Sequence, residues 1–193
     1  MVDDFDVMSR SGHWDRTTRR VIEERIATTP TQQLFDDDEL RKIEKVIEAV
    51  VPGAQENVPI KEVLGREFEG SFRKGVRLVD LPWRPDMYKK GLAFIDEEAR
   101  ERFGKGFLDL SMDEIADLLG KVSLAEVKDG IWEFPPDLFF RTIVEDIVAI
   151  YYSFPQSWNE IKFAGPAYPY GYYQLGCKGR MWYEPELEEG THG

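Results

Sequence analysis

The segment from Pro136 to Tyr152 constrains the fold more than any other part of the sequence. Its apolar residues recur at intervals of three and four and cover about half of a helix circumference. Arg141 and Glu145 fall on the opposite side, four positions apart, as expected for a solvated surface pair. No sustained apolar/polar alternation, which would indicate strands, occurs anywhere in the chain. We therefore predict an all-α fold with this segment as the central helix of the core.

The same spacing predicts shorter or weaker helices elsewhere, about six in all. Asp36 and Ser111 are each followed three positions later by a glutamate, the pattern of a helix N-cap. Glycines are the expected helix ends, and Gly91 is a costly residue inside the fourth predicted helix. Residues 81–85 are expected to form a loop. The predicted helices before the central one are 14–26, 36–51, 59–75, 88–99 and 111–120.

Composition excludes several classes of function. The 193 residues include 25 Lys and Arg against 37 Asp and Glu, so the net charge is 25 − 37 = −12, which disfavours binding to a nucleic acid backbone. One cysteine, Cys177, allows no internal disulfide and no thiolate cluster for a metal. The two histidines, His13 and His192, lie near opposite ends and offer little material for nucleophilic catalysis.

No motif for a cofactor, metal or catalytic residue stands out. Glycine-rich phosphate loops are missing, and residues 104–106 are interpreted as a turn. We assign the carboxylates at 36–38 to the start of a helix, because the helix dipole stabilises negative charge there. A cation site is the less favoured interpretation. Glu145 and Asp146 are adjacent and do not face each other as an acid/base pair would. Cys177 is expected to be a free thiol, and His13 a helix-start residue. We predict that this chain has no catalytic residue, no metal site and no cofactor site.

The last third of the chain is unusually aromatic. Residues 131–193 contain 15 of the Phe, Trp and Tyr residues, against 10 in residues 1–130. Between 158 and 173, two prolines and two glycines stand among six aromatic rings, which argues against one regular helix. The segment is then either a strap over the protein's own helices or a contact surface for another protein. The predicted interface residues are Trp158, Phe163, Gly165, Pro166, Tyr168, Pro169, Tyr170, Gly171 and Tyr172.

The length favours one domain, predicted over residues 13–183 and including an irregular C-terminal arm at 154–183. Residues 1–12 are expected to be a flexible N-terminus and 184–193 an acidic, disordered tail. Arg19 and Arg20 form a twin arginine, but charged residues follow it where an export signal would have an apolar run. No apolar run is long enough to span a bilayer. We expect a cytoplasmic location, the alternative being periplasmic or membrane-associated through a partner.

Several fragments, taken in order, resemble one family. In the C-terminal part they are Phe139-Phe140, Tyr151-Tyr152-Ser153 with Pro155, and the segments 158–161, 163–167 and 169–172. The segments 13–18, 51–60 and 88–92 add to them. Together they resemble the gluconate 2-dehydrogenase subunit 3 family, in its branch without a twin-arginine signal, over about residues 13–175. Phe154 stands where a histidine is expected and Ala164 where a glycine is expected.

The resemblance implies a non-catalytic small subunit that binds and stabilises a large flavoprotein of the glucose-methanol-choline oxidoreductase type. FAD and the oxidation of a sugar or polyol would then belong to that partner, in a stable heterodimer, and a cytochrome subunit is a further partner that the resemblance leaves open. Two alternatives remain: a chaperone that leaves the flavoprotein after maturation, and a free-standing enzyme.

Overall fold

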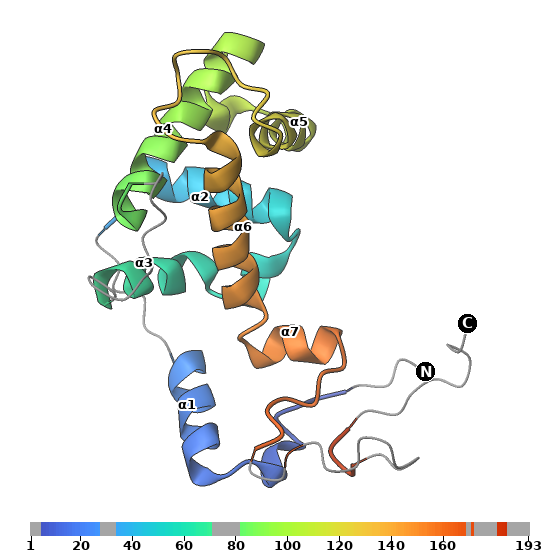
Figure 1. The fold of residues 1–193 in the computed structure, drawn as a ribbon. Helices are drawn as coiled ribbons and strands as arrows, with labels where there is room; N and C mark the ends of the chain where they lie inside the picture. The colour runs from blue at the N-terminus through green and yellow to red at the C-terminus, as the bar shows by residue number, and fades with distance from the viewer. Residues whose placement is uncertain (1–4, 28–33, 71–81, 169–170, 172–180, 185–193) are drawn as a thin grey trace. The chain divides into compact units, whose positions relative to one another are not determined.

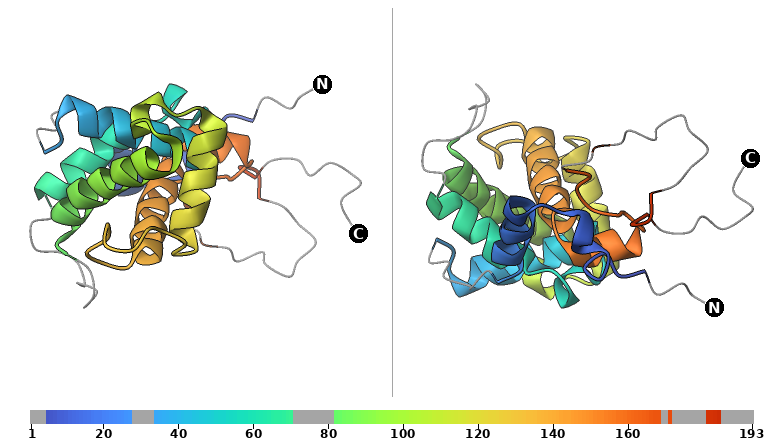
Figure 2. Two further views of the ribbon diagram at one scale, coloured as in Figure 1. Left: turned by 90° about the horizontal axis from the view of Figure 1, so that it is seen from above. Right: turned by 90° about the horizontal axis from the view of Figure 1, so that it is seen from below.

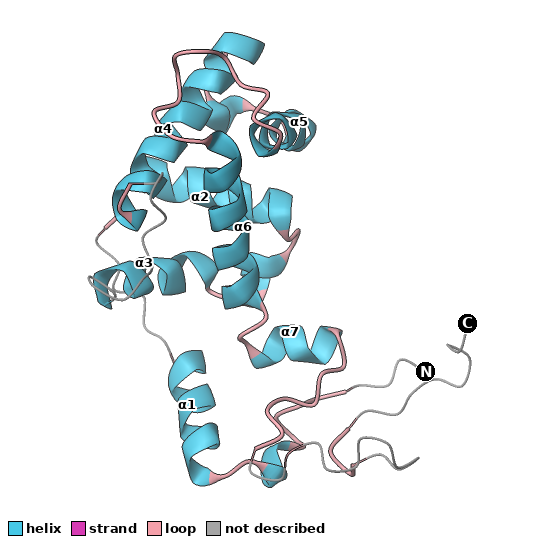
Figure 3. Cartoon of the chain, in the orientation of Figure 1, coloured by secondary structure: helices cyan, strands magenta, loops and turns pink. Residues whose placement is uncertain are grey.

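The computed structural model describes residues 5–27, 34–70, 82–168, 171 and 181–184. Within them it contains seven α-helices and three short 3₁₀ turns (Figure 1). Helices joined by loops, with no strand, make up this described part of the chain (Figure 3). The predicted all-α fold is confirmed. None of the helices in the described ranges is long and apolar enough to cross a membrane.

The chain divides into two compact units. The first, here called the helical unit, is formed by residues 29–151. It contains α2 (Asp37–Val50), η2 (Ala54–Glu56), α3 (Ile60–Gly70), α4 (Arg84–Phe103), η3 (Phe107–Asp109), α5 (Met112–Ser123) and α6 (Pro136–Tyr151). The second, the chain-end unit, combines residues 1–28 with 152–193 and contains η1 (Ser11–His13), α1 (Arg16–Ile26) and α7 (Pro155–Glu160). The predicted domain at 13–183 spans parts of both units.

Helix α6 is the centre of the helical unit, as the width of its apolar stripe predicted. It contacts α2, α3, α4 and α5, and Figure 2 shows it beside α5 from two further directions. Phe139, Ile143 and Ile147 are completely or almost completely buried. On its outer side Arg141 and Glu145 form the expected surface pair, with 4.0 Å between Nε and Oε1. Its buried stripe therefore fixes the positions of four other helices.

Gly91 lets α4 lie directly against Phe139 of α6. The ring of Phe139 occupies the place where a Cβ atom on residue 91 would lie, at separations below 3.0 Å. Tyr88, Trp132 and Phe134 surround the same ring, with centroid distances of 6.4, 5.5 and 6.2 Å. The glycine that is costly by helix propensity is thus required by packing.

Helix α4 is longer than predicted. It begins at Arg84, inside the expected 81–85 loop, and runs for 20 residues to Phe103. Pro85 lies in its first turn, where the missing N–H and the fixed φ of proline suit a helix start. Gly104, at φ 70°, ends the helix in the turn predicted for 104–106. The expected loop included Pro85, but proline also favours the first turn of a helix, and that is its position here.

The two predicted N-caps are confirmed, each with reciprocal hydrogen bonds. The Glu39 N–H donates to Asp36 Oδ1 at 2.8 Å, and the Asp36 N–H donates to Glu39 Oε2 at 3.0 Å. At α5, Glu114 accepts from the Ser111 N–H at 2.8 Å and from Lys105 Nζ at 2.9 Å. The Lys105 hydrogen bond, followed by the Ser111 N–H, lowers the pKa of Glu114 to about 2.

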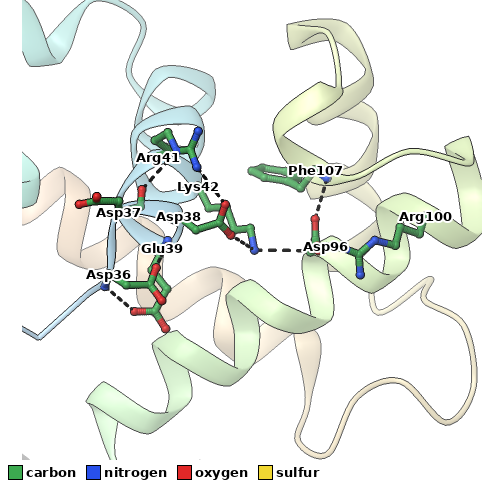
Figure 4. A network of polar contacts seen from close by, with 9 residues as sticks. All are labelled: Asp36, Asp37, Asp38, Glu39, Arg41, Lys42, Asp96, Arg100 and Phe107. Carbon is green, nitrogen blue, oxygen red and sulfur yellow. Dashed lines mark hydrogen bonds and ion pairs between the residues drawn. The ribbon is translucent and has the colours of Figure 1, made fainter.

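The acidic run at 36–38 supports the start of α2 and also reaches α4 through Lys42 (Figure 4). Lys42 Nζ lies 2.7 Å from Asp38 Oδ2 and 3.9 Å from Asp96 Oδ2. The hydrogen bond from Lys42 lowers the pKa of Asp38. Asp96, nearly buried, pairs with Arg100 and accepts the Phe107 N–H at 2.8 Å. These carboxylates join α2, α4 and η3, in agreement with their assignment to structure.

A second buried carboxylate on α4 organises the loop after α5. Glu98 has no exposed surface, and its Oε1 accepts the Lys128 N–H at 2.7 Å. Its Oε2 accepts from Arg102 Nε at 2.9 Å. Because a charge in a protein interior is costly without partners, both oxygens being paired is what allows this glutamate to be buried.

The predicted end of α5 at Gly120 is wrong. Gly120 lies within the helix, exposed, and the helix ends three residues later. The end is a Schellman motif in which the Glu126 N–H donates to the Lys121 oxygen at 2.9 Å and the Ala125 N–H to the Val122 oxygen at 3.1 Å. Ala125 adopts the left-handed conformation, at φ 56°, that glycine usually provides. The helix α3 ends at Gly70, and the end predicted at Gly75 lies outside the described residues.

Replacing Gly91 with Ala should destabilise the protein by about 1–3 kcal/mol, because the added methyl overpacks the contact with Phe139. The matched control is Gly120→Ala, where nothing lies within 4 Å of a Cβ, and it should stabilise by about 0.5–1 kcal/mol through helix propensity. Urea unfolding of both variants measures the difference. Equal effects at the two positions would contradict the packing role of Gly91.

The lowered pKa of Glu114 predicts a contribution to acid sensitivity. Because its folded-state pKa of about 2 is below the unfolded value near 4.5, the stability that it contributes is complete above about pH 5. That contribution should disappear as the pH falls toward about 2. Glu114→Gln keeps a side chain that can cap the helix but cannot titrate, so its unfolding free energy should vary less with pH over this range. Identical pH profiles for the two proteins would contradict the assignment.

Candidate partner interface

The chain-end unit has a small core built from both ends of the sequence. Phe5, Val7, Trp14 and Ile22 come from the N-terminal side and Trp158 from the C-terminal side, and all are at most 5% exposed. The indoles of Trp14 and Trp158 meet edge to face at 6.2 Å. The Val7 N–H donates to Asn159 Oδ1 at 2.8 Å. Residues 5–12, which belong to the segment expected to be flexible, are therefore packed against the arm.

Helix α1 buries one of its apolar residues deeply. Ile22 is 3% exposed, whereas Val21 and Ile26 are 44% and 39% exposed. Asp15 caps the helix by accepting the Thr18 N–H at 2.7 Å, and this hydrogen bond lowers the pKa of its carboxyl group. Arg25 donates to the Ser153 carbonyl at 2.6 Å. The helix is held by its ends more than by a broad apolar stripe.

The arm begins with a short helix that includes the first three residues of the 158–173 segment, and the segment as a whole is not one regular helix. Pro155 starts α7, which continues through Trp158 to Glu160. The helix closes with a Schellman motif, since the Phe163 N–H donates to the Trp158 oxygen at 2.8 Å and the Lys162 N–H to the Asn159 oxygen at 3.2 Å. The rings of Trp158 and Phe163 meet edge to face at 5.7 Å, which is the apolar contact that accompanies this motif.

Gly165 allows the loop after α7 to lie against Trp14. It has φ 80°, and a Cβ on it would be 2.6 Å from Trp14 Cζ2. Glycine is needed here for its backbone conformation and for the close approach. The next residue, Pro166, turns its carbonyl oxygen toward His13 Nε2 at 3.1 Å.

His13 joins three segments of the chain-end unit. It is 3% exposed, and its Nδ1 lies 3.0 Å from the Arg10 carbonyl oxygen. The ring of Tyr183 stacks on it at 3.8 Å. Arg10 adds a further link by donating to the Glu184 carbonyl at 2.8 Å. The prediction that His13 is a helix-start residue is too narrow, because its ring lies at the junction of 5–14, 164–168 and 181–184.

Large apolar side chains remain exposed around this core. In the arm they are Ile161 at 53%, Phe163 at 38%, Tyr168 at 62% and Trp182 at 66%. In the helical unit, the large hydrophobic residues among those described that are exposed are Met112 and Leu124. Exposed aromatic rings on a fixed backbone are typical of surfaces that bind other proteins.

Asp146, one of the two adjacent carboxylates considered as an acid/base pair, has partners inside the helical unit. Asp146 accepts from the Tyr88 hydroxyl at 2.8 Å and pairs with Arg84. Among the described residues, no three His, Cys, Asp or Glu side chains are grouped in a way that could hold a metal ion. Cys177 and His192 lie outside the described residues.

An open groove of about 820 Å³ lies in the helical unit, between α2, residues 55–62 and Met112. Charged residues of both signs line it, and several of them have partners within the fold. Lys61 pairs with Glu44, and Lys45 donates to the Leu110 carbonyl at 3.0 Å. These internal partners are consistent with a structural role for its polar side chains.

Comparison with protein families decides the identity of the chain. The family model described as gluconate 2-dehydrogenase subunit 3 matches residues 37–165, about two thirds of the sequence. The chain belongs to this family. No curated protein and no solved structure matches it.

The match of the gluconate 2-dehydrogenase subunit 3 family extends from the start of α2 to Gly165. It includes Trp158 and Phe163 but ends before Tyr168 and Trp182. Residues 5–14, which complete the core around Trp158, also lie outside it. The arm is thus supported by an N-terminal segment that the family match does not cover.

The predicted interface residues fall into four groups. Phe163 and Tyr168 are exposed, whereas Trp158, Gly165 and Pro166 are used in packing or hydrogen bonding inside the chain-end unit. Gly171 is half-buried with φ 68°. Pro169, Tyr170 and Tyr172 lie outside the described residues. The assignment of these residues to a partner interface stays a prediction.

Two exposed apolar residues of the arm were missed in the sequence. Ile161 was included in the aromatic segment but not in the interface, and Trp182 was not considered. The aromatic enrichment of the last third extends to Trp182 and Tyr183, and it could have pointed to Trp182 as an interface residue. No local signal distinguishes Ile161 from a buried isoleucine. Phe154, where the family resemblance led us to expect histidine, is 1% exposed.

Replacing Gly165 with Ala should loosen the chain-end unit, because the methyl meets Trp14 and the backbone is left-handed. Gly171→Ala is the matched control, since Gly171 also has a positive φ but nothing lies within 4 Å of its Cβ. The near-ultraviolet circular dichroism of the tryptophans should weaken in the Gly165 variant and change little in the control. Unchanged spectra for both variants would show that the contact with Trp14 is not needed.

Proposed function

We propose that this protein is the non-catalytic small subunit of an FAD-dependent dehydrogenase and that its C-terminal arm binds the large flavoprotein subunit. Family membership supports the coarser part of this proposal, that the chain is one subunit of a gluconate 2-dehydrogenase-type assembly. Under the proposal, FAD and the oxidation of a sugar or polyol belong to the partner. The complex stays in the cytoplasm, and its partner is of the glucose-methanol-choline type.

One observation supports the assignment of the interface to the arm. Phe163, Tyr168 and Trp182 are exposed, while the backbone that carries them is fixed by contacts with residues 5–14. Exposing such rings to water is unfavourable, since each buried aromatic side chain removes a large apolar area from solvent. The Schellman motif after α7 and the Trp14 contact order the loop before any partner binds. Pre-ordered rings lose little conformational entropy on association, which favours a stable complex.

This pre-ordering also bears on the alternative of a chaperone that departs after maturation. A transient helper gains little from a rigid, specific surface, because it must release its client. A permanent subunit benefits from one, since slow dissociation accompanies well-packed aromatic anchors. We therefore favour a retained subunit. Size-exclusion chromatography of the assembled pair distinguishes the two, because a subunit co-elutes with the flavoprotein and a chaperone separates.

Purification of the tagged full-length chain, followed by an absorbance scan for bound flavin and mass spectrometry of co-purified chains, tests the partner. With the purified pair, Tyr168→Ala or Trp182→Ala should cost about 2 kcal/mol or more of association free energy if either ring is an anchor. The matched control is Leu124→Ala, which removes an apolar side chain that is 67% exposed in the helical unit. Isothermal titration calorimetry measures all three.

Losses below about 0.5 kcal/mol for both aromatic variants would move the interface away from the arm. A loss for Leu124→Ala equal to theirs would show that the effect is not specific to the arm. Turnover of sugars by the purified chain alone, with an added electron acceptor and no flavoprotein, would refute the non-catalytic role.

A further inference from the structure

His13 is buried between two carbonyl groups. Its Nδ1 lies 3.0 Å from the oxygen of Arg10 and its Nε2 3.1 Å from the oxygen of Pro166. Carbonyl oxygens only accept hydrogen bonds, so each of these contacts is a hydrogen bond only where the ring nitrogen carries an N–H. Neutral imidazole carries one N–H, and its second nitrogen has a lone pair. With a neutral ring, one carbonyl oxygen would therefore face a lone pair in place of a donor, which is unfavourable.

The imidazolium form satisfies both oxygens, because it carries an N–H on each nitrogen. The ring of Tyr183 favours the same form, because it stacks on His13 with the planes 12° apart. Trp14 and Trp182 meet His13 in edge contacts at 5.7 and 6.0 Å. The faces of aromatic rings attract cations. The hydrogen-bond geometry and the aromatic surroundings are separate observations that point to the same charge state.

The charged neighbours of His13 have other partners. On its own segment, the Arg10 guanidinium donates to the Glu184 carbonyl and lies over Phe5, and Arg19 donates to the Ser11 carbonyl. Asp6 accepts the Ser9 N–H. Asp15 caps α1. The remaining titratable groups on the packed segments are Lys162, Tyr168, Tyr183 and Glu184, and the Glu184 carboxylate accepts the Met181 N–H at 2.9 Å.

We propose that His13 is held as an imidazolium and that its second proton fastens the loop at Pro166 to the N-terminal segment. Loss of that proton breaks one of the two carbonyl contacts and loosens the loop that presents Phe163 and Tyr168. Binding of the partner then depends on pH. This last step rests on the proposed function, whereas the charge state of His13 does not.

The charge state can be measured in the full-length chain. His192→Asn leaves His13 as the single histidine, so every imidazole nitrogen signal belongs to it. Long-range ¹H–¹⁵N NMR should show both nitrogens protonated at about pH 7.5. A neutral-tautomer pattern at this pH, in a sample with folded near-ultraviolet circular dichroism, would overturn the proposal. The measurement needs no change at His13, so a folding defect in a His13 variant does not affect it.

The consequence for binding is measured with the purified flavoprotein pair. The affinity of the unmodified chain should fall by about tenfold or more between about pH 6 and pH 9, and that of His13→Gln should be weaker and change less. Equal pH dependence in the two proteins would overturn the regulatory step. No binding at any pH, together with the imidazolium signal, would instead refute the proposed function and leave the charge state of His13 standing.

Discussion

The ring of Phe139 in the space above Gly91 is the contact on which the helical unit depends. It sets how closely α4 lies to α6, and α6 in turn contacts α2, α3 and α5. The position of α4 also places two buried carboxylates. Asp96 receives the N–H of Phe107, and Glu98 receives the N–H of Lys128. A buried carboxylate needs hydrogen-bond donors, and these two N–H groups supply them. The loops before and after α5 are therefore held by carboxylates on α4, whose distance from α6 depends on Gly91.

The parts of this fold that were predictable from sequence are those whose cause is local. The stripe of α6 and the caps at Asp36 and Ser111 involve residues a few positions apart, and all three are observed. Gly91 and Gly120 show where local reasoning fails. Glycine has the same low helix propensity at both positions. At 91 a side chain would collide with the ring of Phe139, 48 positions away, whereas at 120 nothing lies within 4 Å of a Cβ. The true end of α5 was hidden because Ala125, and not a glycine, takes the left-handed conformation.

The candidate interface was predictable as a region but not as a set of side chains. Aromatic enrichment identifies the arm, yet composition cannot divide its rings between core and surface. That division depends on the opposite end of the chain, because Trp14 and Val7 bury Trp158 while Tyr168 and Trp182 stay exposed. Membership of the gluconate 2-dehydrogenase subunit 3 family implies that the chain has a partner in a dehydrogenase assembly.

The joining of the two termini has a consequence for biosynthesis. Val7 and Asn159, which share a hydrogen bond, are 152 positions apart, so this contact must wait until most of the polypeptide has left the ribosome. Long-range closure of this kind is slow compared with the formation of helices from neighbouring residues. A translation product that stops before Trp158 therefore leaves Val7, Trp14 and Ile22 without the ring that completes their core.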